Sequence, residues 1–155
     1  MQEHKLELSK ALAFIMGGKA LFTIRNKETG GRFTYKVNIP KDQEPDNSSV
    51  FFVKLRTHGD GDGAYKYIGF INWYQDRWRF LYGHKSKLPN WEPGIKAFEF
   101  VFNNILSVGR TSNVLEVWHE GKCGRCGLTL TDPESIITGY GKICANKKSK
   151  LKIAA

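Results

Sequence analysis

Apolar and polar side chains alternate strictly along residues 32–39, which read Arg32-Phe33-Thr34-Tyr35-Lys36-Val37-Asn38-Ile39. Successive side chains of a β-strand point to opposite faces of its sheet, so this pattern predicts a strand with one buried and one solvated face. A turn-like segment, residues 27–31, separates it from the apolar stretch 20–25. Together the three segments predict a β-hairpin, and hence an antiparallel sheet.

Further elements are expected on both sides of this hairpin. Strand-like patterns cover residues 50–57, 65–71, 73–82 and 114–119, with polar or glycine-rich loops between most of them. Apolar residues at helical spacing predict helices over residues 4–16 and 94–107. The predicted class is therefore α+β, with an antiparallel sheet of about five strands packed against a helix.

Charge and hydropathy limit the kinds of partner. The chain has 155 residues and a formal net charge of +9. Residues 20–107 carry thirteen Lys and Arg against nine Asp and Glu, and residues 120–155 carry seven against three. This excess favours an anionic partner, most often nucleic acid, although solubility alone also produces basic chains. No apolar run is long enough to cross a bilayer and the N-terminus does not resemble a secretory signal, so we expect a cytoplasmic protein without a membrane partner.

Four potential metal ligands are concentrated near the C-terminus: His119, Cys123, Cys126 and Cys144. Two thiolates separated by two residues bind one ion from a single turn, and Gly124 and Gly127 permit the backbone that such a turn needs. Cys144 returns after seventeen intervening residues, behind a short helix that we expect to begin at a Thr131/Glu134 capping box and to end at Gly139. The spacing predicts a structural Zn²⁺ site in a treble-clef-like finger. We expect an α+β domain over residues 1–113, followed by the zinc-binding finger and a basic tail over residues 114–155.

Other interpretations of the cysteines fit less well. A disulfide framework is disfavoured because the cysteine count is odd and nothing indicates secretion. A thioredoxin-type redox pair lacks its βαβ setting. A nucleobase-deaminase site needs a His-x-Glu helix well before its cysteines and an open metal position, whereas four protein ligands would close the coordination shell here.

The cysteine-rich segment resembles a recurring motif at the C-terminus of small phage and bacterial proteins of unknown function. The similar residues run from His119 through the Thr131-Asp132-Pro133-Glu134-Ser135 stretch to Cys144. That motif usually ends Gly-Ile-Gly-Pro-x-Cys, whereas this chain has Tyr140 and Lys142, a departure that should matter little to the metal. Segments 29–37, 67–69 and 96–100 also look like the preceding region of small members, so the resemblance covers roughly residues 20–146. It implies an origin in a phage or mobile element and a zinc site, and it implies no biochemistry.

The polar sides of the predicted strands are basic. Read as one antiparallel sheet, they place the following side chains on one face: Arg25, Arg32, Lys36, Lys54, Arg56, Lys66, Arg77 and Arg79. A merely solvated face normally mixes both signs of charge, so this set predicts a surface for phosphates or for an acidic protein. Three aromatic residues in loop-like positions either stack on unpaired bases or cover sheet edges: Trp73, Tyr74 and Trp91.

No constellation of catalytic residues can be assembled, so we do not expect an enzyme. The loop 58–63, with its alternating Gly and Asp, matches neither a phosphate-binding loop nor a calcium loop and is interpreted as a flexible connection. The sequence thus predicts a small zinc-stabilised nucleic-acid-binding protein. The alternative is a phage-encoded inhibitor that binds a host defence or replication complex, in the cytoplasm of a bacterial host.

Overall fold

A single antiparallel sheet organises the computed structural model, which describes residues 4–59, 61–146 and 151. Its seven described strands lie in the order β1-β7-β2-β3-β4-β5-β6. Their bounds are Lys5–Leu6, Leu115–His119, Lys19–Asn26, Arg32–Asn38, Phe51–Arg56, Tyr65–Tyr74 and Arg77–Tyr82 in that order. The α+β class and the antiparallel sheet are confirmed, and the sheet has two more strands than the sequence predicted.

Strands β2 to β6 form a meander in which each strand pairs with the next one along the chain. The last connection, between β5 and β6, consists of Gln75 and Asp76, which both have positive φ angles of 51° and 62°. Two residues of positive φ form the tight hairpin turn that matches the twist of the flanking strands. The predicted strand break near Asn72 was therefore wrong, because β5 continues through it to Tyr74.

Strand β7 lies inside the sheet although it comes last in the sequence. It pairs with β2 on one side, with Ile24 opposite Val117, and with the short strand β1 on the other. The sheet therefore extends across the predicted boundary between residues 113 and 114.

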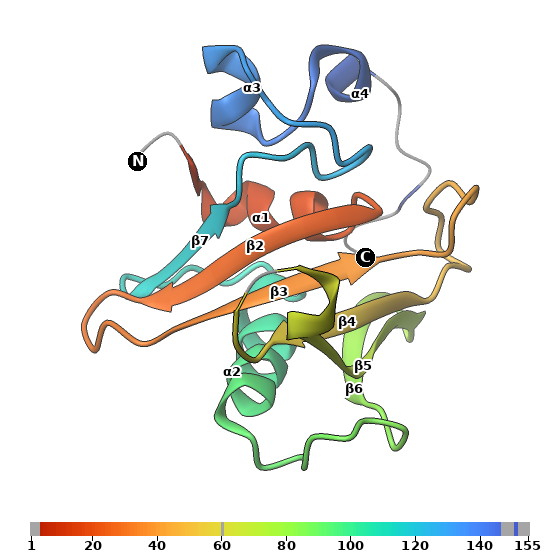
Figure 1. Ribbon diagram of the computed structural model, residues 1–155, viewed down its shortest axis with the longest axis vertical. Helices are drawn as coiled ribbons and strands as arrows, with labels where there is room; N and C mark the ends of the chain where they lie inside the picture. Colours follow the sequence, from red (N-terminus) through yellow and green to blue (C-terminus); the bar gives the residue numbers. More distant parts are fainter. Residues whose placement is uncertain (1–3, 60, 147–150, 152–155) are drawn as a thin grey trace.

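One layer of helical segments covers one face of the sheet (Figure 1). Helix α1 spans Leu8–Ile15, and α2 spans Pro93–Val101 and continues as the π-helical turn η3, Phe102–Leu106. The predicted helix over 94–107 is thus two elements, and the predicted helix over 4–16 is shorter because β1 occupies its start. Between helices and sheet lies an aromatic core whose largest fully buried members include Phe14, Phe22, Tyr35, Phe51, Trp78, Phe98 and Phe102.

The edge strand β6 is protected by a side chain. Asn103 in η3 accepts a hydrogen bond from the Phe80 amide at 2.8 Å and donates one to the Phe80 carbonyl at 3.0 Å. These two bonds imitate a neighbouring strand and satisfy backbone groups that an open edge leaves unpaired. A second copy of the chain therefore has little opportunity to pair at this position.

The C-terminal finger extends past the end of β7 and carries two short helices, α3 (Pro133–Thr138) and α4 (Lys142–Asn146). Helix α3 begins at Asp132, whose carboxylate accepts a hydrogen bond from the Ser135 amide at 3.1 Å, and ends at Gly139 with φ 81°. The cap is thus Asp132 and not the predicted Thr131, whereas the stop at Gly139 is confirmed. No helix in the described part of the chain is both long and apolar enough to span a bilayer.

Candidate metal centre and basic sheet face

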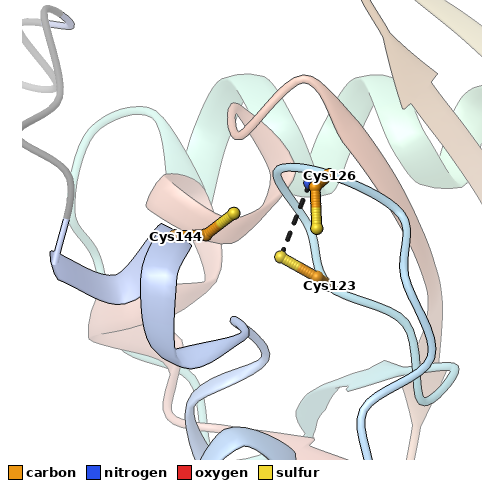
Figure 2. A group of neighbouring side chains, drawn as sticks. All are labelled: Cys123, Cys126 and Cys144. Carbon is orange, nitrogen blue, oxygen red and sulfur yellow. Dashed lines mark hydrogen bonds between the residues drawn. The ribbon is translucent and has the colours of Figure 1, made fainter.

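Cys123 and Cys126 lie in a tight turn at the base of the finger. The Arg125 and Cys126 amides both point at the Cys123 sulfur, with N···Sγ distances of 3.4 Å and 3.5 Å. Figure 2 shows the contact between Cys126 and Cys123. Gly127 follows with φ 80°, a conformation that other residues rarely adopt, and its amide donates to the Cys123 carbonyl at 2.9 Å. This is the local geometry that lets one turn present two sulfur atoms to one ion.

Cys144 reaches the same point from α4. Figure 2 shows its side chain directed at the two cysteines of the turn. The three sulfur atoms lie within 4.8 Å of one another. Zn–S bonds of 2.3 Å in a tetrahedron require a separation of about 3.8 Å, so small rotations of the side chains would suffice. The three predicted cysteine ligands are brought together, and they are close enough to hold a metal ion.

The three sulfur atoms influence one another's ionisation. Burial raises the pKa of the Cys123 thiol, but hydrogen bonds from the Gly141, Cys126 and Arg125 amides lower it, and the net direction is downward. Burial and the two adjacent sulfur atoms raise the pKa of Cys144 to about 12. Without a cation, therefore, the three groups do not all ionise near neutral pH. A divalent ion compensates the repulsion and makes all three available as thiolates.

His119, the fourth predicted ligand, is not part of this group. Its imidazole is buried, Nδ1 accepts a hydrogen bond from the Gly121 amide at 3.0 Å, and Nε2 contacts the carbonyl of Ile136 in α3. Burial lowers the pKa of His119, which favours the neutral ring. Because Nδ1 accepts, the single proton is on Nε2 and is donated to Ile136. Among the described residues, only the three cysteines form the cluster of potential ligand atoms.

The finger is docked on the rest of the molecule through Phe14 of α1. A Cβ atom on Gly124 or Gly139 would come within 2.6 Å or 2.8 Å of the Phe14 ring, so only glycine allows this approach. The Lys19 amide donates to the Gly124 carbonyl at 3.0 Å, and the Tyr140 hydroxyl donates to the Ala13 carbonyl at 2.6 Å. The spacing of cysteines does not reveal this docking; Gly124 and Gly139 were predicted only as turn and stop residues.

The sheet face opposite α1, α2 and η3 is called the outer face below. The strand register places seven of the eight predicted basic residues on it: Arg25, Arg32, Lys36, Lys54, Arg56, Arg77 and Arg79. Among these, Arg77 is an exception, because its guanidinium donates a hydrogen bond to the Asn103 carbonyl of η3 at 3.4 Å, on the helical side of the sheet. Lys66 is not on this face, and its predicted place was wrong. A β-bulge between Val53 and Lys54 shifts the register, so Lys66 lies opposite the buried Leu55 and Tyr67 lies opposite Lys54. Because of the bulge, Tyr67 is on the outer face and Lys66 is on the opposite face, the reverse of the predicted arrangement.

Two carboxylates reach the outer face beside β2, one from β7 and one from the residue that follows it. Glu116 forms ion pairs with Arg25 at 2.7 Å and with Lys5 at 3.1 Å. Glu120 accepts a hydrogen bond from the Thr23 hydroxyl at 3.3 Å. Strands β3 to β6 contain no Asp or Glu at all. The charge of Arg25 is therefore compensated by Glu116.

Aromatic side chains also lie on the outer face, and one of them, the exposed Tyr74 of β5, is among the three predicted for stacking. Phe52, which is 37% exposed, lies 6.4 Å from the Tyr67 ring, and Trp118 lies opposite Thr23. Of the predicted stacking residues, Trp73 packs edge-on against the core residue Trp78. Trp91 is exposed, but it belongs to the loop before α2 and not to this face.

Comparison with known proteins gives a partial match. Residues 115–148, which comprise β7 and the finger, match the model of a family of unknown function (DUF6011). No curated protein and no solved structure matches the chain.

Proposed function

We propose that this chain is a zinc-stabilised protein that binds nucleic acid through the outer face. The observation that carries the proposal is a pair of like charges directly opposite each other, Lys36 on β3 and Lys54 on β4. Cross-strand like charges destabilise a sheet, since facing Cβ atoms are only about 5 Å apart. A polyanion that bridges them removes this cost, because each phosphate contact replaces a condensed counterion.

The surroundings of this pair support the same function. Arg32 lies four residues before Lys36 on the same face of β3. Arg79 lies on β6, where its guanidinium is 5.8 Å from the Tyr74 ring. The Lys36 ammonium lies 4.3 Å from the centre of the Tyr65 ring. Cations interleaved with aromatic rings are typical of surfaces that bind phosphates and bases together.

The metal in this proposal is Zn²⁺ in a structural role. Thiolates within one compact cluster favour zinc over the harder divalent cations. Cys123, Cys126 and Cys144 supply three ligands. His119 becomes the fourth only if its ring gives up at least one of its contacts to Gly121 and Ile136. The resemblance of the finger motif to small phage and bacterial proteins supports an origin in a phage or mobile element as part of the same proposal.

The experiment compares two double charge reversals that change the net charge equally. Arg32→Glu with Lys54→Glu changes the outer face, and Lys96→Glu with Arg110→Glu changes the opposite layer, on α2 and just after η3. Fluorescence anisotropy with a labelled oligonucleotide is measured at several salt concentrations. Loss of two phosphate contacts is expected to weaken binding about tenfold or more and to reduce the slope of log affinity against log salt by about 1.4.

The control pair is expected to bind with nearly unchanged affinity and slope. Equal effects of the two pairs, or no binding by the wild-type chain, would contradict the proposal. A protein target, which is the alternative function, would be indicated by capture of a partner that survives nuclease treatment and is lost with the outer-face variant.

A further inference from the structure

A pocket of about 420 Å³ lies on the outer face where β7, β2, β3 and β4 run side by side. One row of side chains crosses all four strands. Trp118 is opposite Thr23, Thr23 is opposite Thr34, and the β3–β4 register places Arg56 next to Thr34. The Cα positions of Trp118 and Arg56 are three strand spacings apart, or about 14 Å.

The two threonines make this position hollow. Their hydroxyls are hydrogen-bonded to each other at 2.7 Å, so they form a short, polar floor. The long side chains of Trp118 and Arg56 border this floor at its two ends. The volume of the pocket falls in the range of small-ligand sites, and its lining is mostly polar and charged, with Trp118 as its large aromatic side chain.

The charges in the pocket are unevenly distributed. Arg32 and Arg25 lie directly opposite each other, and Arg25 is paired with Glu116. No ion pair of Arg32 is found among the described residues. Arg56 donates from Nε to the Gly59 carbonyl at 2.6 Å, which holds its guanidinium at the rim. An anion is therefore attracted to the Arg32 and Arg56 side of the pocket.

The Trp118 side of the pocket has the opposite character. Glu120 lines it and disfavours a phosphate there. The indole, held by a hydrogen bond from Nε1 to Glu116 at 3.4 Å, offers an aromatic surface of the kind that unpaired bases stack on. A ligand with a flat ring at one end and a phosphate at the other matches both sides.

The width of the sheet selects between single-stranded and double-stranded partners. From β7 to β6 the outer face spans five strand spacings, or about 24 Å, whereas the major groove of DNA is about 12 Å wide and admits at most a two-stranded ribbon. The face therefore cannot enter a duplex groove to reach base edges. Unpaired bases, in contrast, can lie flat on it.

We propose that this pocket takes one unpaired nucleotide of a single-stranded nucleic acid, with its base on Trp118 and its phosphate between Arg32 and Arg56. The inference rests on the proposed function and specifies its ligand. It separates this pocket from the rest of the outer face, where contacts to phosphates are expected to be less specific.

The test uses Trp118→Leu with Trp91→Leu as the matched control, because Trp91 is 70% exposed and lies away from the pocket. Affinity of the full chain for a labelled single-stranded oligonucleotide is measured, together with affinity for its duplex. Trp118→Leu is expected to weaken single-strand binding roughly 5- to 150-fold, as for loss of one stacked base. Trp91→Leu is expected to leave it unchanged, and the duplex is expected to bind at least about tenfold more weakly than the single strand.

Arg32→Gln and Arg110→Gln provide a second comparison that does not depend on how well Trp118→Leu folds, since both arginines are exposed. Only Arg32→Gln is expected to weaken binding. If the wild-type chain binds single strands but Trp118→Leu and Arg32→Gln bind equally well, or if the duplex binds as tightly, the pocket inference is overturned while the proposed function stands. If the wild-type chain binds no nucleic acid, both fail.

Discussion

At the scale of single residues, the sulfur atoms and the imidazole of the finger have different roles. The sulfur atoms of Cys123, Cys126 and Cys144 converge, whereas both ring nitrogens of His119 contact backbone groups. A structural zinc site contributes about 10 to 16 kcal/mol, so one thiolate accounts for about 3 kcal/mol, or a factor of about 100 in affinity. His119, at the end of β7, instead contacts the Ile136 carbonyl in α3 through its imidazole.

This difference predicts opposite outcomes for two substitutions. Cys144→Ser is expected to lose the bound metal during purification or to bind it about 100-fold more weakly. His119→Gln is expected to retain one equivalent and to lower the free energy of unfolding, because a buried contact to Ile136 is lost. Elemental analysis and competition with a chelator measure both. Loss of metal from His119→Gln would show that the imidazole is the fourth ligand after all.

Glu116 makes stability sensitive to acid. Burial raises its pKa, but hydrogen bonds from Arg25, Lys5 and Trp118 outweigh this and lower it below the ordinary value of 4.5. The unfolded chain therefore binds the proton more readily, so the stabilisation by Glu116 is complete above pH 4.5 and is lost as the pH falls through the lower, folded-state pKa.

Chemical denaturation between pH 6 and pH 3 tests this expectation. The difference in unfolding free energy between the wild-type chain and Glu116→Gln is expected to shrink as the pH falls. Glu99→Gln, at an exposed ion pair with Lys96, should show little change. A difference that stays constant over this range would contradict the account.

The cysteines were predictable because ligand spacing is a local property of the sequence. The orientation of His119 was not, because a tertiary contact to α3 competes with the metal for its nitrogens. Trp118 was not singled out either, since its neighbours across the sheet are far away in the sequence.

At the scale of elements, the packing of α1 against the finger depends on a glycine. Gly139 ends α3 with a positive φ and faces the Phe14 ring at a distance that leaves no room for a Cβ atom. Gly139→Ala is expected to lower the free energy of unfolding by about 1 to 3 kcal/mol, from backbone strain and steric overlap. Gly141→Ala is the control, because nothing lies within 4 Å of its added Cβ atom, and it is expected to change stability by less than about 0.5 kcal/mol. Equal effects in thermal or denaturant unfolding would contradict this packing.

Most helices and strands could be predicted from the spacing of apolar residues along the sequence. Three features of the sheet could not. The bulge at Val53 and Lys54 changes which β5 residues face solvent, and alternation alone cannot reveal an added residue. The turn at Gln75-Asp76 contains no glycine or asparagine, so the sequence lacks the usual sign of a tight hairpin. The position of β7 between β1 and β2 depends on long-range pairing, which sequence patterns do not specify.

At the scale of the whole molecule, two separate apolar clusters stabilise the sheet and the finger. The large cluster joins the sheet to α1, α2 and η3, and the small one consists of Cys123, Leu130 and Cys144 with their neighbours. Removal of the metal with a chelator is therefore expected to loosen the finger and to spare the sheet. Hydrogen exchange should accelerate at amides of residues 120–146, while amides of β3 to β5 keep their protection. Unfolding of the entire chain by the chelator would show that the finger and the sheet form one cooperative unit.

Photochemical cross-linking can establish whether the outer face binds nucleic acid. The full chain is irradiated with a single-stranded oligonucleotide, and the attached peptides are identified by mass spectrometry. We expect cross-links to outer-face aromatic residues, above all Trp118, Tyr65 and Tyr67. Cross-links confined to α2, η3 or the finger, or none at all, would contradict the proposal.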